Sequence, residues 1–268
     1  MKTLKSIFWL LLMLGAISFV AVSVTGCDDK NKEVIDPDDP NDPDDPDDPD
    51  DPDDPEVSLP DSILNGSDFY IIFMDPVSTA QLGNKVKQPT MLRDYDVWNA
   101  GETLEGVTPT GVNAWGQPEA YTAFRTTNEG WAGGAIISIL SQFETAPDLS
   151  PLMDGEYYFH FAVKSPSNQE QAAWRFFFYS EGSEAYFDFG AGTDNNYAHN
   201  GEWQHFEIPI SELINQGYLW TGPLTLEGPP SAGEDRKYIL GYLAPAFEGL
   251  PFIPGTELNL DALFFYKK

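Results

Sequence analysis

The chain has 268 residues and a formal net charge of −29, from 43 acidic and 14 basic side chains. Residues 57–268 alone carry 27 acidic and 10 basic side chains, a net charge of −17. Such an excess of negative charge argues against nucleic acid and against an anionic membrane surface as binding partners.

The N-terminus has the layout of a secretory leader. Two basic residues, Lys2 and Lys5, precede an apolar run from Ile7 to Val24. This pattern is typical of a signal peptide, although the run is also long enough for a retained transmembrane anchor. The lack of a basic stop-transfer cluster directly after the run favours the signal peptide.

The leader leads into Cys27, the only cysteine of the chain. Val24-Thr25-Gly26-Cys27 resembles the bacterial lipobox, in which the cysteine is lipidated and becomes the new N-terminus. We therefore predict a lipoprotein signal peptide over residues 1–26 and a lipid anchor on Cys27. No cysteine would then remain for a disulfide, a metal site or a nucleophile. Asp28-Asp29 resembles the acidic signal of surface lipoproteins in some Gram-negative bacteria, which predicts a surface-exposed outer-membrane location.

Residues 27–56 are predicted to be the lipidated cysteine followed by an extended linker. Asp36–Pro55 contains twelve aspartates and repeats Asp-Asp-Pro. Proline at every third position matches the three-residue turn of polyproline II, and ~3.1 Å per residue would extend this segment on the order of 60 Å. Aspartate-rich repeats can also bind calcium, but a calcium loop needs a bend that gathers oxygens at one point, so a spacer is favoured.

Residues 57–268 are predicted to form one all-β domain, a single β-sandwich or jelly roll. Aromatic residues are dense, helix signals are few, and short strand patterns alternate with turn residues. A short helical turn is expected over Ile208–Gln216. The expected strands are Phe69–Met74, Tyr121–Thr126, Gly134–Leu140, Tyr157–Lys164, Ala173–Tyr179, Ala185–Phe189, Trp203–Ile208, Tyr238–Leu243 and Leu258–Tyr266.

Two of these strands have informative faces, because alternate residues of a strand point to opposite sides. One face of Tyr157–Lys164 and one face of Ala173–Tyr179 are wholly apolar, and we assign both faces to the core. The opposite faces mix aromatic and polar residues. Either loops cover these faces, or they form an exposed platform that includes Tyr158, His160, Arg175 and Tyr179.

Six segments carry a family resemblance when taken in order. They are Asp96–Asn99, Gly111–Gly116, Gly130–Gly134, Gly155–Phe159, Gly201–Pro209 and Leu260–Tyr266. Together they resemble the galactose-binding-like jelly rolls of surface glycan-binding lipoproteins from starch-utilisation-like systems, over most of residues 69–268. The resemblance implies binding of polysaccharide or oligosaccharide without cleavage, and its transfer to an outer-membrane importer.

The same resemblance implies a structural calcium, because some related domains hold one where the first and last strands meet. The residues that match are Asp75 and Asp261. Each of them could equally be an ordinary solvated or turn carboxylate.

The chemistry of sugars selects the candidate binding residues. A sugar ring presents patches of C–H groups, which flat aromatic faces cover, and a rim of hydroxyls, which Asn, Gln, Glu, Arg and His bind. Trp115 leads because it lies in a Gly/Asn-rich loop, although any one tryptophan could belong to the core instead. The predicted set is Trp98, Trp115, Trp131, Asn113, Gln117, Glu119, Tyr158, His160, Arg175 and Tyr179.

Two other classes of function stay open. A glycoside hydrolase needs two carboxylates across the scissile bond, and the chain lacks the Glu-x-Asp-x-x-Glu run of jelly-roll glucanases. Asp94-x-Asp96 alone is more typical of one strand face, and the three histidines lack metal-site spacing, so we do not expect an enzyme. A structural or protein-binding envelope lipoprotein would also use exposed aromatics, and would show a flat apolar patch rather than a groove.

Overall fold

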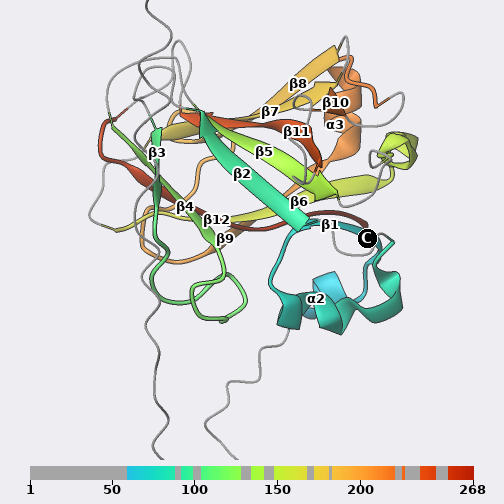
Figure 1. Cartoon of the computed structure of the whole chain (residues 1–268), viewed down its shortest axis with the longest axis horizontal. Helices are drawn as coiled ribbons and strands as arrows, with labels where there is room; N and C mark the ends of the chain where they lie inside the picture. The colour runs from blue at the N-terminus through green and yellow to red at the C-terminus, as the bar shows by residue number, and fades with distance from the viewer. Residues whose placement is uncertain are drawn as a thin grey trace, which may run out of the picture. The chain divides into compact units, whose positions relative to one another are not determined.

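Figure 1 shows the computed structural model of the chain, which describes residues 59–87, 92–98, 104–127, 134–141, 148–167, 172–180, 183–220, 225–226, 236–245 and 253–268. All of them belong to the second of two units into which the chain divides, Met1–Asp51 and Pro52–Lys268. The predicted leader, Cys27, the linker and Trp131 lie outside the described residues.

The described strands form two antiparallel sheets, named here after their central strands. The β12 sheet has the order β3 (Leu104–Val107), β4 (Thr122–Thr126), β12 (Glu257–Lys267), β6 (Tyr157–Lys164) and β9 (Gln204–Pro209), with β1 (Ser67–Phe73) also paired to β12. The β11 sheet has the order β2 (Leu92–Trp98), β5 (Gly134–Ser141), β11 (Arg236–Pro245), β7 (Ala173–Ser180) and β8 (Ser183–Gly190), with β10 (Thr225–Leu226) on β11. The prediction of an all-β sandwich of the jelly-roll type is confirmed.

The helical elements are short and lie between strands. They are α1 (Asp61–Leu64), α2 (Pro76–Leu82), the 3-10 turns η1 (Gly83–Lys85) and η2 (Ser150–Asp154), and α3 (Ile210–Asn215). Among the residues described, no helix has the length and apolarity needed to span a membrane. The helical turn expected at Ile208–Gln216 is confirmed as α3.

All nine expected strands overlap observed ones, and Tyr157–Lys164 has the bounds of β6. The strands β2, β3 and β10, the helices α1 and α2, and the turns η1 and η2 were not expected. The start of α2 had a local signal, because Asp75 accepts a hydrogen bond from Ser78 N at 2.8 Å and Pro76 occupies the first turn. Both are typical of a helix N-terminus.

The main core lies between the two sheets, where the apolar faces of β6 and β7 meet. The rings of Phe159 and Phe178 cross edge to face at 5.1 Å, and those of Phe161 and Phe176 lie 4.8 Å apart. Trp174 is fully buried beside them. Burial of each such phenylalanine contributes roughly 1.5–3 kcal/mol relative to exposure. The assignment of these two faces to the core is confirmed.

A second apolar cluster covers the opposite side of the β12 sheet. Its members come from α1, α2, β1, β6, β12 and the loop around Trp115, and include Phe69, Phe264 and Tyr266. His160 on the second face of β6 is only 1% exposed as a result. Of the two alternatives for that face, cover by loops is the one observed, and Figure 1 shows α2 next to β1 on this side.

Candidate functional site

The loop that carries Trp115 is a closed structure. Val112 bridges Pro118, and Asn113 Oδ1 accepts hydrogen bonds from the backbone nitrogens of Trp115 at 2.9 Å and Gln117 at 2.8 Å. Asn113 is buried, Gln117 is half-buried and Glu119 is exposed. The asparagine therefore holds the loop together from inside, which is a structural role.

Two buried carboxylates fix this loop to the sheet. Asp75 Oδ2 accepts a hydrogen bond from Asn113 Nδ2 at 3.0 Å, and Asp261 Oδ2 accepts one from Ala114 N at 2.9 Å. The two residues thus meet at the same loop, as the expected calcium site requires. Within the described residues, however, no group of three or more His, Cys, Asp or Glu side chains could hold a metal ion. Three of the four carboxylate oxygens accept hydrogen bonds from N–H groups, namely those of Ser78 N, Asn113 Nδ2 and Ala114 N, and the calcium site stays a prediction.

The indole of Trp115 packs inward, with 9% of its surface exposed. Its ring lies 4.8 Å from that of His205 and 5.9 Å from that of His160. At 9% exposure it offers little aromatic face to a sugar. For this tryptophan the structure shows the core alternative.

His160 is neutral in the fold. Its Nδ1 lies 2.8 Å from the carbonyl oxygen of Ala262 and must carry the proton, because a carbonyl only accepts. Its Nε2 then accepts a hydrogen bond from Nδ1 of His205 at 3.2 Å. Burial, with a smaller contribution from the nearby His205, lowers the pKa of His160 to about 3, although the Ala262 carbonyl opposes the shift.

The other predicted residues do not assemble around Trp115. Tyr158 is half-buried on β6, where its ring lies 6.3 Å from that of Tyr266, whereas Arg175 is on β7 of the other sheet. Tyr158 and Arg175 therefore do not share one platform. The side chains of Trp98 and Tyr179 lie outside the described residues.

An open aromatic and polar surface does exist on the outer face of the β7–β8 hairpin, and we call it the hairpin face. It consists of Arg175, Phe177, Tyr186 and Asp188. The register pairs Arg175 with Asp188 and Phe177 with Tyr186, so all four share one side of the sheet. Tyr186 is 47% exposed. Residues between them, such as Phe176 and Phe187, point into the core instead.

Arg175 organises the hairpin face. Its Nε and Nη2 form a two-pronged ion pair with Asp188, the second contact at 2.5 Å. Its guanidinium carbon lies 4.0 Å from the centre of the Tyr186 ring and 5.6 Å from that of Phe177. The hydrogen bond to Asp188 raises the pKa of Arg175, so the guanidinium stays charged. The pair holds an aromatic ring, a cation and an anion in fixed relative positions.

A pocket of about 360 Å³ adjoins the hairpin face. It is lined by Tyr186, Phe187, Asp188, Gly192, Thr193, Asp194, Asn195 and Glu212. Most of these residues offer hydroxyl, amide or carboxylate groups, and one offers an exposed aromatic ring. Sequence reasoning missed all of them. The alternation of Ala185–Phe189 could have placed Tyr186 and Asp188 opposite the buried Phe187.

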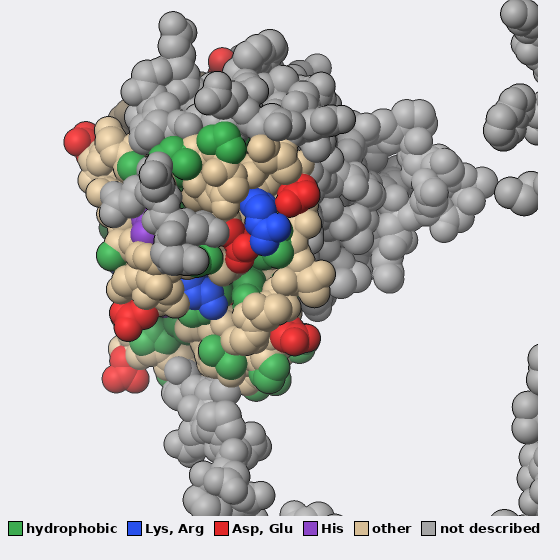
Figure 2. Space-filling view, turned by 90° about the vertical axis from the view of Figure 1, so that its left-hand side faces the viewer, with side chains coloured by type: hydrophobic (Ala, Val, Ile, Leu, Met, Phe, Trp, Pro, Cys, Tyr) green, Lys and Arg blue, Asp and Glu red, His purple; other side chains and the backbone are tan. Residues whose placement is uncertain are grey.

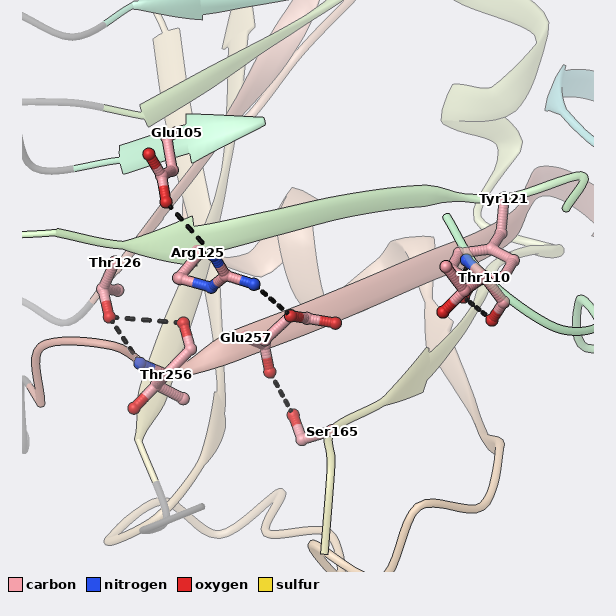
Figure 3. A network of polar contacts seen from close by, with 8 residues as sticks. All are labelled: Glu105, Thr110, Tyr121, Arg125, Thr126, Ser165, Thr256 and Glu257. Atoms are coloured by element: carbon pink, nitrogen blue, oxygen red, sulfur yellow. Dashed lines mark hydrogen bonds and ion pairs between the residues drawn. The ribbon is translucent and has the colours of Figure 1, made fainter. Parts of the chain in front are cut away.

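A second polar region ties strands of the β12 sheet to one another. Figure 3 shows Arg125 of β4 between Glu257 of β12, at 3.0 Å, and Glu105 of β3, at 3.4 Å. Thr126 Oγ1 also accepts a hydrogen bond from Thr256 N at 2.9 Å. Such partly exposed ion pairs contribute about 0–1 kcal/mol each. The contacts join neighbouring strands, so we assign this network to the fold.

Trp203 is half-buried, but contacts within the chain already engage its indole, so it is a poor candidate for sugar binding. Lys164 Nζ lies 4.6 Å from its ring centre, and Trp203 Nε1 donates a hydrogen bond to the Val112 carbonyl at 3.1 Å. The lysine thus covers one face of an indole that is already half-buried, which leaves it little open ring for a sugar. Figure 2 shows one side of the molecule. On that side, hydrophobic side chains are scattered between polar ones and are not gathered in one flat patch.

No protein-family model matches the chain, and a search of curated proteins gave no significant match. Among solved structures it is similar to a family 30 carbohydrate-binding module, with a TM-score of 0.38, 14% identity, and coverage of 75% of this chain and 99% of that chain. It is also similar to the family 11 carbohydrate-binding module of a cellulosomal cellulase of Clostridium thermocellum, with a TM-score of 0.35, 11% identity, and coverage of 68% and 91%.

A third similar structure is SGBP-B from a complex xyloglucan utilization locus in Bacteroides uniformis. Its TM-score is 0.33 and its identity 16%, with 62% of this chain and 45% of that chain covered. All three TM-scores are below 0.5, so these likenesses by themselves establish no function for the chain.

Proposed function

We propose that this chain binds extracellular polysaccharide or oligosaccharide at the hairpin face and its adjoining pocket, without cleaving it. The observation that carries the proposal is the exposed ring of Tyr186, held between the Arg175–Asp188 ion pair and a polar pocket of about 360 Å³. An aromatic ring beside convergent hydrogen-bonding groups matches the two surfaces of a sugar ring.

The position of Arg175 explains how Tyr186 can serve a ligand. The guanidinium lies over one face of the ring, and nearly half of the tyrosine is still exposed to solvent. A sugar ring can therefore pack against the tyrosine through its C–H groups. Its hydroxyls then reach the carboxylate of Asp188, each of whose oxygens has a second lone pair beyond the one used by Arg175.

The proposal extends to the setting of the domain. The chain would be a lipoprotein anchored through Cys27 to the outer membrane and exposed on the cell surface, with residues 27–56 as a stiff spacer. It would pass captured glycan to an importer complex in that membrane. A domain held on the order of 60 Å from a bilayer is suited to large extracellular ligands, and the acidic linker supports an extended spacer.

Affinity electrophoresis tests the binding directly. The full-length chain, purified in detergent, is run in native gels that contain mixed-linkage β-glucan, xyloglucan or starch, three neutral polysaccharides. We expect retardation by at least one of them, and Tyr186→Ala should weaken it up to about tenfold, since an aromatic contact contributes about 0.5–1.5 kcal/mol. Val77→Ala removes an equally exposed apolar side chain on α2 and should change nothing. Unretarded migration in all three gels would end the proposal.

A glycoside hydrolase is the second candidate, because the pocket brings carboxylates together. Asp188 is engaged by Arg175, which leaves Asp194 and Glu212 of the lining as the acid and base that hydrolysis requires. Reducing sugar that accumulates with time in each polysaccharide, and stops with Glu212→Gln, would establish this candidate in place of simple binding. Glu202→Gln, outside the pocket lining, is the matched control.

A further inference from the structure

The pocket lies where its sheet ends. Among the described strands, β8 is the last of the β11 sheet, and its residues Tyr186 and Asp188 line one wall of the pocket. Glu212 of α3 and the turn from residue 192 to 195 supply the other walls, and Figure 1 shows α3 beside β8. A glycan that crosses the hairpin face from Phe177 towards Tyr186 therefore reaches a wall instead of a continuous groove.

The α3 wall is fixed to the strand through one side chain. Gln216, just after α3, accepts a hydrogen bond from Tyr186 N and donates one to the Tyr186 carbonyl, each at 3.0 Å. These two bonds satisfy backbone groups that an edge strand otherwise presents to a partner strand. Gln216 therefore fixes the α3 wall of the pocket next to Tyr186, which supplies the aromatic ring of the site.

The turn that forms the opposite wall is also fixed. Asn195 Nδ2 donates to the Asp188 carbonyl at 3.1 Å, Gly190 N donates to the Asn195 carbonyl at 3.0 Å, and Thr193 Oγ1 donates to the Gly190 carbonyl at 2.7 Å. Gly190 has φ +96°, and a Cβ there would lie 2.4 Å from the Ala172 carbonyl oxygen, so a glycine is required. A pocket with such walls is formed before a ligand arrives, which lowers the entropic cost of binding.

The charges of the pocket select the kind of ligand. Within the described part of the chain, Asp194 and Glu212 have no ion-pair partner, while Asp188 is neutralised by Arg175. Two uncompensated carboxylates accept hydrogen bonds from hydroxyl groups and repel carboxylate or sulfate groups. A volume of about 360 Å³ is near the lower end of small-molecule sites, which suits a short piece of glycan.

We propose that the pocket binds the terminal unit of a neutral glycan chain, so that the protein recognises chain ends and not chain interiors. This inference rests on the proposed function, and it names the ligand class of the same site. The hairpin face holds the sugar next to the terminus, and the pocket surrounds the terminal sugar and binds its hydroxyls.

Counting binding sites per mass of glycan tests the inference. The full-length chain is titrated by calorimetry with mixed-linkage β-glucan, xyloglucan and starch, each intact and after partial acid hydrolysis, at equal mass. Chain ends are measured as reducing sugar. We expect the number of sites per gram to rise in proportion to chain ends. Sites per gram that stay constant or fall on hydrolysis would overturn chain-end recognition while leaving glycan binding intact. A lack of heat with all three glycans would overturn both.

Pocket variants provide a second, independent measurement. Asp194→Asn and Glu212→Gln keep the shape of the side chains and remove the charge, and each should weaken binding of the hydrolysed glycan about tenfold, as expected for a hydrogen bond to a charged group. Glu202→Gln makes the same change outside the pocket lining and should bind as the unmodified chain does. Matching urea midpoints show that the variants are folded. Pocket variants that bind as tightly as the control would contradict the proposal.

Discussion

The neutral, buried His160 makes a sharp prediction about acid stability. Burial lowers its pKa in the fold to about 3, although the Ala262 carbonyl and the charge of Glu207 favour the protonated form. The charges of His205 and Lys268 act in the same direction as burial. In the unfolded chain the pKa is about 6.5. The unfolded state therefore binds a proton first, and stability present above pH 6.5 is lost as the pH falls towards 3.

The size of this loss follows from the two pKa values. Each pH unit between them costs about 1.4 kcal/mol, because the unfolded chain holds one proton that the folded chain does not. Between pH 7.5 and pH 4.5 the contribution of His160 to the free energy of unfolding should fall by about 2.7 kcal/mol. Other groups also respond to acid, so the prediction concerns a difference between two chains.

Urea unfolding of the full-length chain, followed by tryptophan fluorescence at both pH values, measures that difference. His160→Phe keeps a ring against Phe264, on which the histidine stacks at 4.4 Å and 12°, and removes the group that takes up the proton. The variant loses hydrogen bonds to Ala262 and His205, which costs about 1–3 kcal/mol at either pH. Its further loss at pH 4.5 should be smaller than that of the unmodified chain by about 2.7 kcal/mol. Equal losses in both chains would refute the reasoning.

Three further outcomes are expected. Gly241→Ala should lower the free energy of unfolding by about 3 kcal/mol or more, because its Cβ would lie 1.9 Å from the Phe177 carbonyl oxygen. Gly83→Ala has open space around its Cβ and should cost only about 1–3 kcal/mol, from the backbone strain of an alanine at φ +55°. Cys27→Ser should move the chain from the membrane to the soluble fraction of cells, and an unchanged distribution would contradict the lipid anchor. EDTA should leave the midpoint of thermal unfolding unchanged, because N–H groups already bind three of the four oxygens of Asp75 and Asp261; a fall that excess calcium reverses would establish the ion instead.

Much of the fold could be read from the sequence because strand alternation is a local property. Tyr157–Lys164 and Ala173–Tyr179 have one wholly apolar face each, and a sandwich has only one place for such faces. The strand β2 was missed because Arg93, Asp94 and Asp96 give it the composition of a polar loop. Its pairing with β5 depends on partners 36 to 48 residues along the chain.

The site was much harder to predict because aromatic type does not reveal exposure. Trp115 has the loop setting of a ligand contact, yet Asp75 and Asp261, from distant parts of the chain, hold its loop down so that the indole packs on His205. Tyr186 carries no such sequence signal. It is exposed because it lies on the outer face of β8, opposite the core-facing Phe187.

The sequence alone was enough to assign the apolar faces of β6 and β7 to the core, and it predicts an acidic linker and a preference for neutral over anionic ligands. These properties depend on composition and on the two-residue period of a strand. Only the tertiary structure decided which second face is open. Loops and α2 cover the second face of β6, whereas that of the β7–β8 hairpin stays exposed beside a pocket that α3 closes. That choice depends on contacts between segments far apart in the chain, which no local pattern encodes.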